Sequence, residues 1–216
     1  MRCAAIIVAA GGSRRMGFDK LAAEIRGVSV LRRSVDAFMA VDAVTAVIVV
    51  APEDRFESLG TDFPKPLHRA DGGKERQDSV ANGLALVTED LVAVHDGARP
   101  LVSPAAILSC IEAAADSGAA ALARQVTETL KRSDAGGLAR ESVSREQLWF
   151  METPQAFQTA LLRNAYATVR EQGLSITDEV SAMEAIGVAT KLVPSPSPNL
   201  KITVPADIEL ANALLR

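Results

Sequence analysis

The sequence predicts a doubly wound α/β fold, in which helices cover both faces of a mostly parallel β-sheet. Three short runs, 4–10, 46–51 and 91–95, are continuously apolar and are bounded by turn-forming or charged residues. Such runs are typical of parallel strands buried between two layers of helices. Residues 29–40 and 76–87 lie between these runs and carry apolar side chains at helical spacing. This alternation of strands and helices is the pattern of a doubly wound sheet.

Length and composition indicate one soluble domain that spans residues 1–216. A net charge of −4 argues against a general nucleic-acid binder, because no broad positive field would attract a phosphate backbone. No segment approaches the ~20 apolar residues of a membrane span, so we expect no membrane partner and a cytoplasmic location. The two cysteines, Cys3 and Cys110, lack the spacing of a metal or redox pair and are expected to be buried thiols.

The second half of the chain continues the pattern with one interruption. Ser103 and Pro104 suit the N-cap and first position of a helix that ends near Gly118. Further elements are expected as a fourth parallel strand at 119–123, helices at about 155–171 and 177–187, a strand at 190–193, and a C-terminal helix from Pro205.

The interruption lies at about 126–152, where polar residues alternate as in two strands joined by a turn at 134–137. A hairpin this polar does not suit the interior of a parallel sheet, so we expect it to project as an arm. An isolated hairpin is only marginally stable in water, which points to support from a second subunit. A solvated excursion on a monomer is the alternative.

The first predicted strand leads directly into a glycine-rich segment at residues 9–20. Backbone N–H groups in a glycine turn between strand and helix can approach an anion closely, and the helix adds its positive end. Three cations, Arg14, Arg15 and Lys20, lie in the same segment, which suits a triphosphate. The spacing alone therefore favours phosphate binding over a solvated turn.

Two other segments fall at or just after predicted strand ends, where ligands bind in such sheets. Residues 71–79 form a second glycine turn that enters a helix, and residues 94–100 include His95, Asp96 and Arg99. An aspartate at a strand end can contact Mg²⁺ or ribose hydroxyls, and an arginine can bind phosphate. His95 at a strand end is more often structural than a catalytic base.

Taken together, these segments resemble one enzyme family. The motifs AAGGSRRMG with DK, DGGKERQDSV, VHDGARP, TLKR, TPQAF, ITDEVSAME and NLKITVPAD occur in the order found in the 2-C-methyl-D-erythritol 4-phosphate cytidylyltransferases of isoprenoid biosynthesis. The glycine loop alone would fit any sugar-nucleotide pyrophosphorylase, whereas the whole set, from residue 4 to the C-terminus, is specific. The resemblance implies the Rossmann-like fold of nucleotide-diphospho-sugar transferases.

The resemblance implies an enzyme that transfers the cytidylyl group of CTP to 2-C-methyl-D-erythritol 4-phosphate, with Mg²⁺, and releases pyrophosphate. It also implies a homodimer in which the arm of each subunit reaches the partner's active site. The residues that it assigns to catalysis are Arg15, Lys20, Arg145 and Lys201. Those assigned to the nucleotide are Ala9, Ala10, Gly11, Gly12, Gly73, Lys74, Arg76, Ser79 and Asp96, the last also a possible metal ligand. Those assigned to the second substrate are Gly97, Arg99, Thr129, Arg145, Thr153, Thr177 and Lys201.

The chain departs from the family pattern at a few positions. Val8 stands where the family commonly has proline, Lys74 replaces a usual acidic residue, and Gly97 stands where alanine is usual. The loop between Met16 and Lys20 is also shorter than in many relatives. Of these changes, Lys74 bears most directly on the choice of base.

Two other functions are compatible with parts of the sequence. A cytidylyltransferase for ribitol 5-phosphate or another polyol phosphate would share the nucleotide loop, although TLKR and ITDEVSAME favour methylerythritol phosphate. A non-catalytic nucleotide-binding domain would have lost its cations, whereas Arg15, Lys20, Arg145 and Lys201 are all present.

Overall fold

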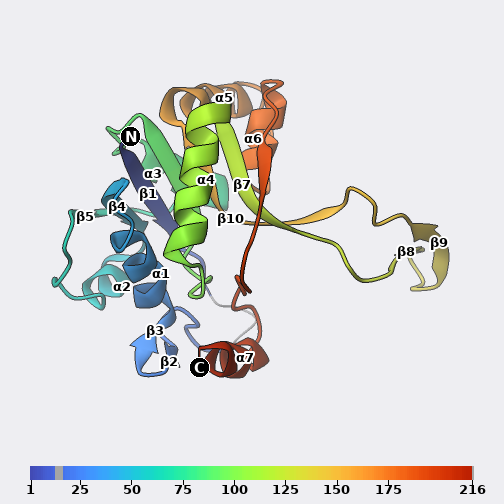
Figure 1. The fold of residues 1–216 in the computed structure, drawn as a ribbon, viewed down its shortest axis with the longest axis horizontal. Helices are drawn as coiled ribbons and strands as arrows, with labels where there is room; N and C mark the ends of the chain where they lie inside the picture. Colours follow the sequence, from blue (N-terminus) through green and yellow to red (C-terminus); the bar gives the residue numbers. More distant parts are fainter. Residues whose placement is uncertain (13–16, 216) are drawn as a thin grey trace.

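The computed structural model of the chain describes residues 1–12 and 17–215. Its centre is a seven-stranded sheet in the order β11-β7-β10-β6-β1-β4-β5 (Figure 1). Strand β10 is antiparallel to both of its neighbours, and the remaining neighbours are parallel. The predicted mostly parallel α/β fold is therefore confirmed. The strands are β1 (Cys3–Val8), β4 (Val44–Val50), β5 (Leu67–Ala70), β6 (Leu91–Asp96), β7 (Ala119–Gln125), β10 (Trp149–Gln158) and β11 (Lys191–Pro194).

Helices cover both faces of the sheet, as continuous apolar strands require. Alternate residues of β1 point to opposite faces, so Ala5 and Ile7 join one buried cluster while Ala4 and Ile6 join the other. The first face is covered by α1 (Val30–Met39) and α4 (Pro104–Ser117), and the second by α3 (Arg76–Leu84), α5 (Thr159–Glu171) and α6 (Glu179–Ala185). The remaining elements are α2 (Glu53–Glu57), the β2 (Glu24–Ile25) and β3 (Val28–Ser29) hairpin, and α7 (Ala206–Leu214), which contacts β2.

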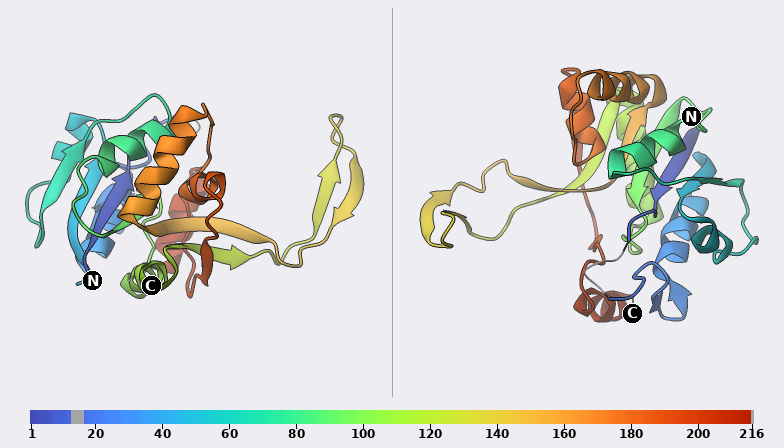
Figure 2. Two further views of the ribbon diagram at one scale, coloured as in Figure 1. Left: turned by 90° about the horizontal axis from the view of Figure 1, so that it is seen from above. Right: turned by 180° about the vertical axis from the view of Figure 1, so that it is seen from behind.

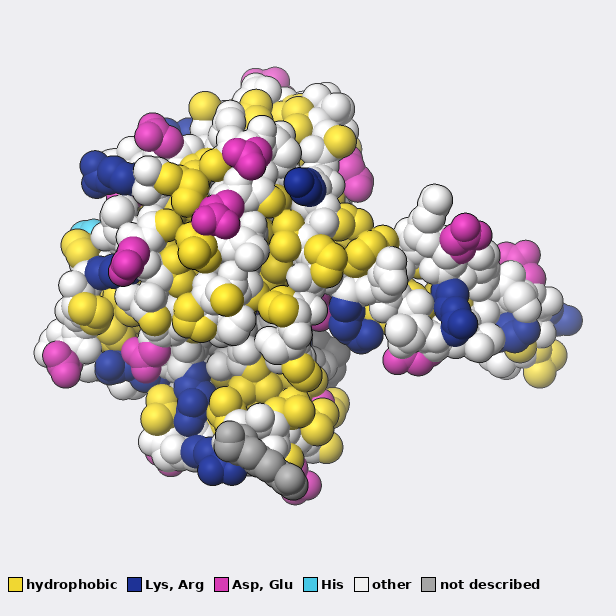
Figure 3. Space-filling model, in the orientation of Figure 1, with side chains coloured by type: hydrophobic (Ala, Val, Ile, Leu, Met, Phe, Trp, Pro, Cys, Tyr) yellow, Lys and Arg dark blue, Asp and Glu magenta, His cyan; other side chains and the backbone are white. Residues whose placement is uncertain are grey.

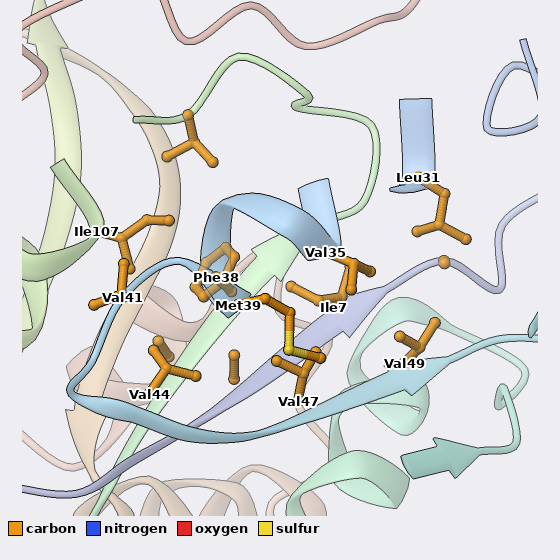
Figure 4. Close-up of a cluster of buried hydrophobic side chains, with 14 of the residues drawn as sticks. Ile7, Leu31, Val35, Phe38, Met39, Val41, Val44, Val47, Val49 and Ile107 are labelled. Atoms are coloured by element: carbon orange, nitrogen blue, oxygen red, sulfur yellow. The ribbon is translucent and has the colours of Figure 1, made fainter. Parts of the chain in front are cut away.

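The packing of α1 shows how the core fixes the central strands. Val35 and Phe38 point from the helix toward Ile7 of β1 and Val47 of β4 (Figure 4). All four side chains are completely buried. Burying such side chains stabilises the fold by about 1.5–3 kcal/mol each. This packing fixes α1 against β1 and β4.

Local sequence signals place the helix ends where they were expected. The Ser103 hydroxyl accepts a hydrogen bond from the Ala106 N–H at 3.2 Å, and Pro104 is the first residue of α4. The helix ends at Gly118, whose φ of +85° is a left-handed conformation that glycine adopts without strain. Both predicted ends of α4 are confirmed.

Strand β10 corrects two of the predictions. The helix expected from about residue 155 begins at Thr159, because residues 149–158 form a strand inside the main sheet. The segment 119–123 runs in the same direction as β6, as expected of a fourth parallel strand. However, β10 is inserted between β6 and β7 and pairs antiparallel with both.

The polar hairpin forms the projecting arm that the sequence predicts. Strands β8 (Leu130–Ser133) and β9 (Ala139–Val143) make a two-stranded sheet that stands away from the body (Figures 1 and 2). The turn lies at the expected place, with the Gly137 N–H donating to the Asp134 carbonyl at 3.1 Å. Charged side chains are spread over the arm (Figure 3), and Arg132 pairs with Glu141 across its strands at 2.7 Å.

The boundary of the arm differs from the expected 126–152. Residues Trp149–Met151 of β10 pair with Ala123–Gln125 of β7, so the base of the arm continues the main sheet. The projecting part is therefore shorter at its C-terminal side than predicted.

The remaining global expectations concern the thiols and the membrane. Cys3 and Cys110 are buried and free, as predicted. Burial raises the pKa of the Cys110 thiol to about 12, so it stays protonated and unreactive. No helix in the described part of the chain is long and apolar enough to cross a membrane.

Candidate active site

A cavity of about 340 Å³ opens at the carboxyl ends of β1 and β6, the usual position of ligands in such sheets. All nine residues predicted to bind the nucleotide line it, and so do the predicted catalytic lysines, Lys20 and Lys201. Segments far apart in the sequence thus converge on one site. Arg14 and Arg15 lie outside the described residues. The described lining is Val8, Ala9, Ala10, Gly11, Gly12, Lys20, Leu21, Gly73, Lys74, Glu75, Arg76, Ser79, Asp96, Ala98 and Lys201.

The second glycine turn packs directly against the first. A Cβ atom at Gly72 would lie 2.5 Å from the Ala10 Cβ atom, so only glycine allows the two loops to approach this closely. The Gly73 N–H donates to the Ser79 hydroxyl at 3.0 Å, and that hydroxyl donates to the Glu75 carbonyl at 3.1 Å. The hydroxyl of Ser79 therefore shapes the loop that would hold the base. Its expected contact with cytosine stays a prediction.

Asp96, at the end of β6, is the centre of the charge network. Its Oδ2 atom accepts from the Lys201 ammonium at 2.6 Å, and its Oδ1 atom lies 3.3 Å from the Arg76 guanidinium. Burial alone would raise the pKa of Asp96, but Lys201 and Arg76 outweigh it and hold the pKa well below its usual range. Asp96 is thus a permanent anion that fixes the positions of two cations.

Arg76 is held from its other side by a buried acid. Glu179, which is completely buried, accepts from the Arg76 guanidinium at 2.6 and 3.0 Å, and from the Tyr166 hydroxyl at 3.0 Å. Burial would lower the pKa of Arg76, but Glu179 and Asp96 raise it above its usual range. The sequence motif ITDEVSAME includes Glu179, but the roles of Glu179 and Tyr166 were not predicted. Glu179 lies 103 residues after Arg76 and 13 residues after Tyr166, so no local spacing in the sequence connects these side chains.

His95 is a structural residue and not an exposed base. Its ring is completely buried, with Nδ1 2.9 Å from the Thr153 hydroxyl and Nε2 3.2 Å from the Arg99 carbonyl. Burial lowers the pKa of His95 to about 4, so the ring is neutral at neutral pH. The Thr153 hydroxyl also accepts from the Asp96 N–H at 3.1 Å. Thr153 therefore supports Asp96 from behind, and its expected contact with substrate stays a prediction.

The buried state of His95 makes stability depend on pH in a defined window. The unfolded chain accepts a proton at the ordinary pKa of 6.5, whereas the folded protein resists it until about pH 4. Lowering the pH from 6.5 to 4 should therefore reduce the free energy of unfolding, by up to about 3 kcal/mol. Denaturant unfolding at several pH values measures this loss. The variant His95→Asn should be less sensitive to pH in that window, and an unchanged slope would contradict the assignment.

Arg99 and Gly97 lie behind the nucleotide cavity. The Arg99 guanidinium donates to the Asn199 carbonyl at 2.7 Å, and its buried Nε atom has no hydrogen-bond partner among the described residues. A Cβ atom at Gly97 would lie 2.9 Å from the Leu31 Cδ1 atom and 3.2 Å from the Val8 carbonyl oxygen. Gly97 packs against these two residues and does not line the nucleotide cavity, so its expected contact with the second substrate stays a prediction.

A second cavity, of about 650 Å³, adjoins the first. It is lined by Arg99 and Arg124 and by the proline-rich segment 195–199. Lys201 lines both cavities. Lys201 is therefore a residue that the two cavities share, and its ammonium group is held by Asp96.

The remaining predicted residues are not brought into the cavity of their own chain. Thr129 and Arg145 are exposed on the segments that lead to and from the arm, and the Arg145 guanidinium donates to the Thr127 carbonyl. Thr177 is exposed just before α6. None of the three lines the two cavities described above. For the arm residues, this position is the one expected if they serve a partner's site.

Comparisons with known proteins identify the family. The family model of 2-C-methyl-D-erythritol 4-phosphate cytidylyltransferase (IspD) matches residues 3–216. The chain belongs to the IspD family. It is 38% identical to the 2-C-methyl-D-erythritol 4-phosphate cytidylyltransferase of Pelotomaculum thermopropionicum, over all of this chain and 94% of that protein. It is 43% identical to the bifunctional enzyme IspD/IspF of Anaeromyxobacter dehalogenans, with 97% of this chain matching, but it spans only 56% of that longer protein.

Solved structures of IspD proteins share the fold. The enzyme from Thermus thermophilus aligns with a TM-score of 0.83 at 36% identity, over 99% of this chain and 98% of that one. The synthase from Anaerococcus prevotii aligns with a TM-score of 0.87 at 28% identity, over 99% and 96%. The Rossmann-like nucleotidyltransferase fold implied by the sequence motifs is thus confirmed.

Proposed function

We propose that the chain transfers the cytidylyl group of CTP to 2-C-methyl-D-erythritol 4-phosphate, giving 4-diphosphocytidyl-2-C-methyl-D-erythritol and pyrophosphate. The observation that carries the proposal is the pair of adjoining cavities joined by Lys201. CTP would occupy the cavity lined by the two glycine turns, and the acceptor would enter from the cavity lined by Arg99.

The chemistry requires cations more than a base. The acceptor phosphate is ionised at neutral pH and can attack the α-phosphorus in line, so no side chain needs to remove a proton. The protein must bring two anions together and neutralise the charge that develops on the α-phosphate. Lys20 and Lys201 supply charge at the cavity, whereas the neutral, buried His95 supplies none. We assign Arg15, by family resemblance, to the same task as Lys20.

Magnesium would enter with the triphosphate. Asp96 and Glu75 carry the carboxylates among the described lining residues, and the oxygens of Asp96 already contact Lys201 and Arg76. No group of three or more possible ligands occurs in the described part of the chain. The two carboxylates would suit Mg²⁺, which proteins commonly bind through one or two carboxylates together with substrate phosphates. When bound, the ion would offset phosphate charge.

We further propose that the enzyme is a cytoplasmic homodimer in which Thr129 and Arg145 of one subunit complete the partner's site. No residue from 127 to 148 belongs to either buried hydrophobic cluster, and both residues lie outside the two cavities of their own chain. A second subunit would explain both features.

Turnover of alternative acceptors tests the proposed function. Pyrophosphate release with CTP should be much faster with methylerythritol phosphate than with ribitol 5-phosphate, and the family match supports the same preference. ATP or GTP in place of CTP should give little product, since the larger purines do not suit a base pocket built from the 73–79 loop. A clear preference for ribitol 5-phosphate would overturn the proposal.

A further inference from the structure

Arg55 is a residue outside the cavity that grips the glycine-rich loop. It lies in the short helix α2 and is largely buried, with 15% of its side chain exposed. Its Nη1 atom donates to the Ala9 carbonyl and, at 3.5 Å, to the Gly11 carbonyl. Arg55 is absent from the cavity lining, so it does not face the ligand itself.

The same guanidinium also reaches the far end of the loop. Its Nε and Nη2 atoms donate to the Asp19 carboxylate at 3.2 and 3.0 Å. The other oxygen of Asp19 accepts from the Leu21 N–H at 3.0 Å. Arg55 therefore bridges residues before and after the segment that carries Arg14 and Arg15. The planar, five-donor guanidinium can make all these contacts at once, whereas an ammonium cannot.

The two carbonyl contacts determine where the loop's amides point. In a planar trans peptide, the C=O and the N–H of the same unit point in opposite directions. The Ala9 and Gly11 carbonyls share their peptide units with the Ala10 and Gly12 N–H groups. Because Arg55 binds both carbonyls, the Ala10 and Gly12 N–H groups point away from the guanidinium. Ala10 and Gly12 both line the nucleotide cavity, so we infer that their N–H groups point toward it.

These two amides are also available for a ligand. Within the described residues, neither the Ala10 N–H nor the Gly12 N–H donates a hydrogen bond to the protein. Backbone amides that lie close together in a glycine-rich turn and point into a cavity form a favourable site for phosphate oxygens. We propose that Arg55 is a positioning residue, which orients the Ala10 and Gly12 amides toward the phosphates of the bound nucleotide. The inference rests on the proposed function only for the identity of that nucleotide.

The variant Arg55→Met tests this role in the full chain. The Kd and KM of CTP should rise on the order of 10–100-fold, because two hydrogen bonds to a charged group lose their fixed geometry. The KM of the acceptor should change less than about twofold, since the acceptor does not contact these amides. Inorganic tripolyphosphate should lose affinity by a factor similar to that for CTP, whereas the weak binding of cytidine should be unaffected.

A matched control separates this effect from general destabilisation. The Arg163 guanidinium likewise donates to two backbone carbonyls, those of Leu84 at 3.3 Å and Val87 at 2.7 Å, but it lies away from the nucleotide cavity. Arg163→Met should leave CTP and tripolyphosphate binding unchanged. If Arg55→Met does not fold, Arg55→Lys serves the same comparison, with a smaller loss in the same phosphate-specific direction.

The outcomes distinguish this inference from the proposed function. CTP binding within twofold of wild type in Arg55→Met would overturn the role of Arg55, as would an equal loss of cytidine and tripolyphosphate binding. If the wild-type chain bound CTP but did not transfer it to methylerythritol phosphate, the proposed function would fail while the Arg55 comparison could still be made.

Discussion

Replacing Lys20 with alanine should lower kcat by about 10²–10³-fold, while CTP affinity falls much less. Lys20 lines the nucleotide cavity, and its ammonium donates to the Ile202 carbonyl at 2.7 Å. This contact anchors the charge beside the segment that carries Lys201. If Lys20 stabilises charge that appears on the α-phosphate only during reaction, its loss must affect turnover more than ground-state binding.

The control for Lys20 is another lysine with the same kind of contact. The Lys65 ammonium donates to the Val41 carbonyl at 2.5 Å, and Lys65 lines neither cavity of the site. Lys65→Ala should keep kcat near the wild-type value. Steady-state rates of pyrophosphate release measure both variants. A Lys20→Ala enzyme with nearly normal kcat, or with a loss confined to the KM of CTP, would remove Lys20 from the proposed transition-state role.

Mixing two inactive variants should restore activity if the arm completes the partner's site. Arg145→Ala should be impaired on its own because it removes a cation from the acceptor's phosphate. In a hybrid with Lys20→Ala, one site has an intact Lys20 from one subunit and an intact Arg145 from the other, while the second site lacks both. With random exchange, half of the dimers are hybrids, so activity should reach roughly a quarter of the wild-type value.

The result depends on proof that subunits exchange. Two differently tagged chains, purified through both tags after mixing, isolate the hybrid directly, and its activity should be roughly half that of the wild type. A purified hybrid that stayed as inactive as its parents would show that Arg145 acts within its own chain or not at all.

The strands that the sequence predicts correctly are those with the simplest environment. Residues 4–10, 46–51 and 91–95 are apolar on both faces, and β1, β4 and β6 occupy them to within two residues or so. The part of β10 after residue 152 was missed because the strand contains Pro154 and buried polar side chains such as Glu152 and Gln155. Proline has no N–H for the ladder, and the pairing with β7 is interrupted between Met151 and Gln155. The sheet tolerates an irregular strand that a pattern of apolar residues cannot reveal.

The same distinction holds for the candidate site. Residues at strand ends and in glycine turns, such as Gly11, Gly73 and Asp96, could be found because loops at the carboxyl ends of parallel strands meet. The long-range contacts that hold such residues in place could not be found. Arg55 contacts Asp19 across 36 residues, and Arg76 contacts Glu179 across 103. Only the fold determines these partners, and no local spacing identifies them.

A structure with CTP bound would show directly whether the two cavities hold the nucleotide and the acceptor. We expect the triphosphate to lie against Lys20, with its oxygens on the Ala10 and Gly12 amides, and the cytosine to lie beside residues 73–79. We also expect Lys201 between the nucleotide and the second cavity, with the arm of a partner subunit placing its Arg145 at the entrance of that cavity. CTP bound elsewhere, or bound here with its phosphates turned away from Lys20, would overturn the proposed roles of Lys20 and of the glycine-rich loop.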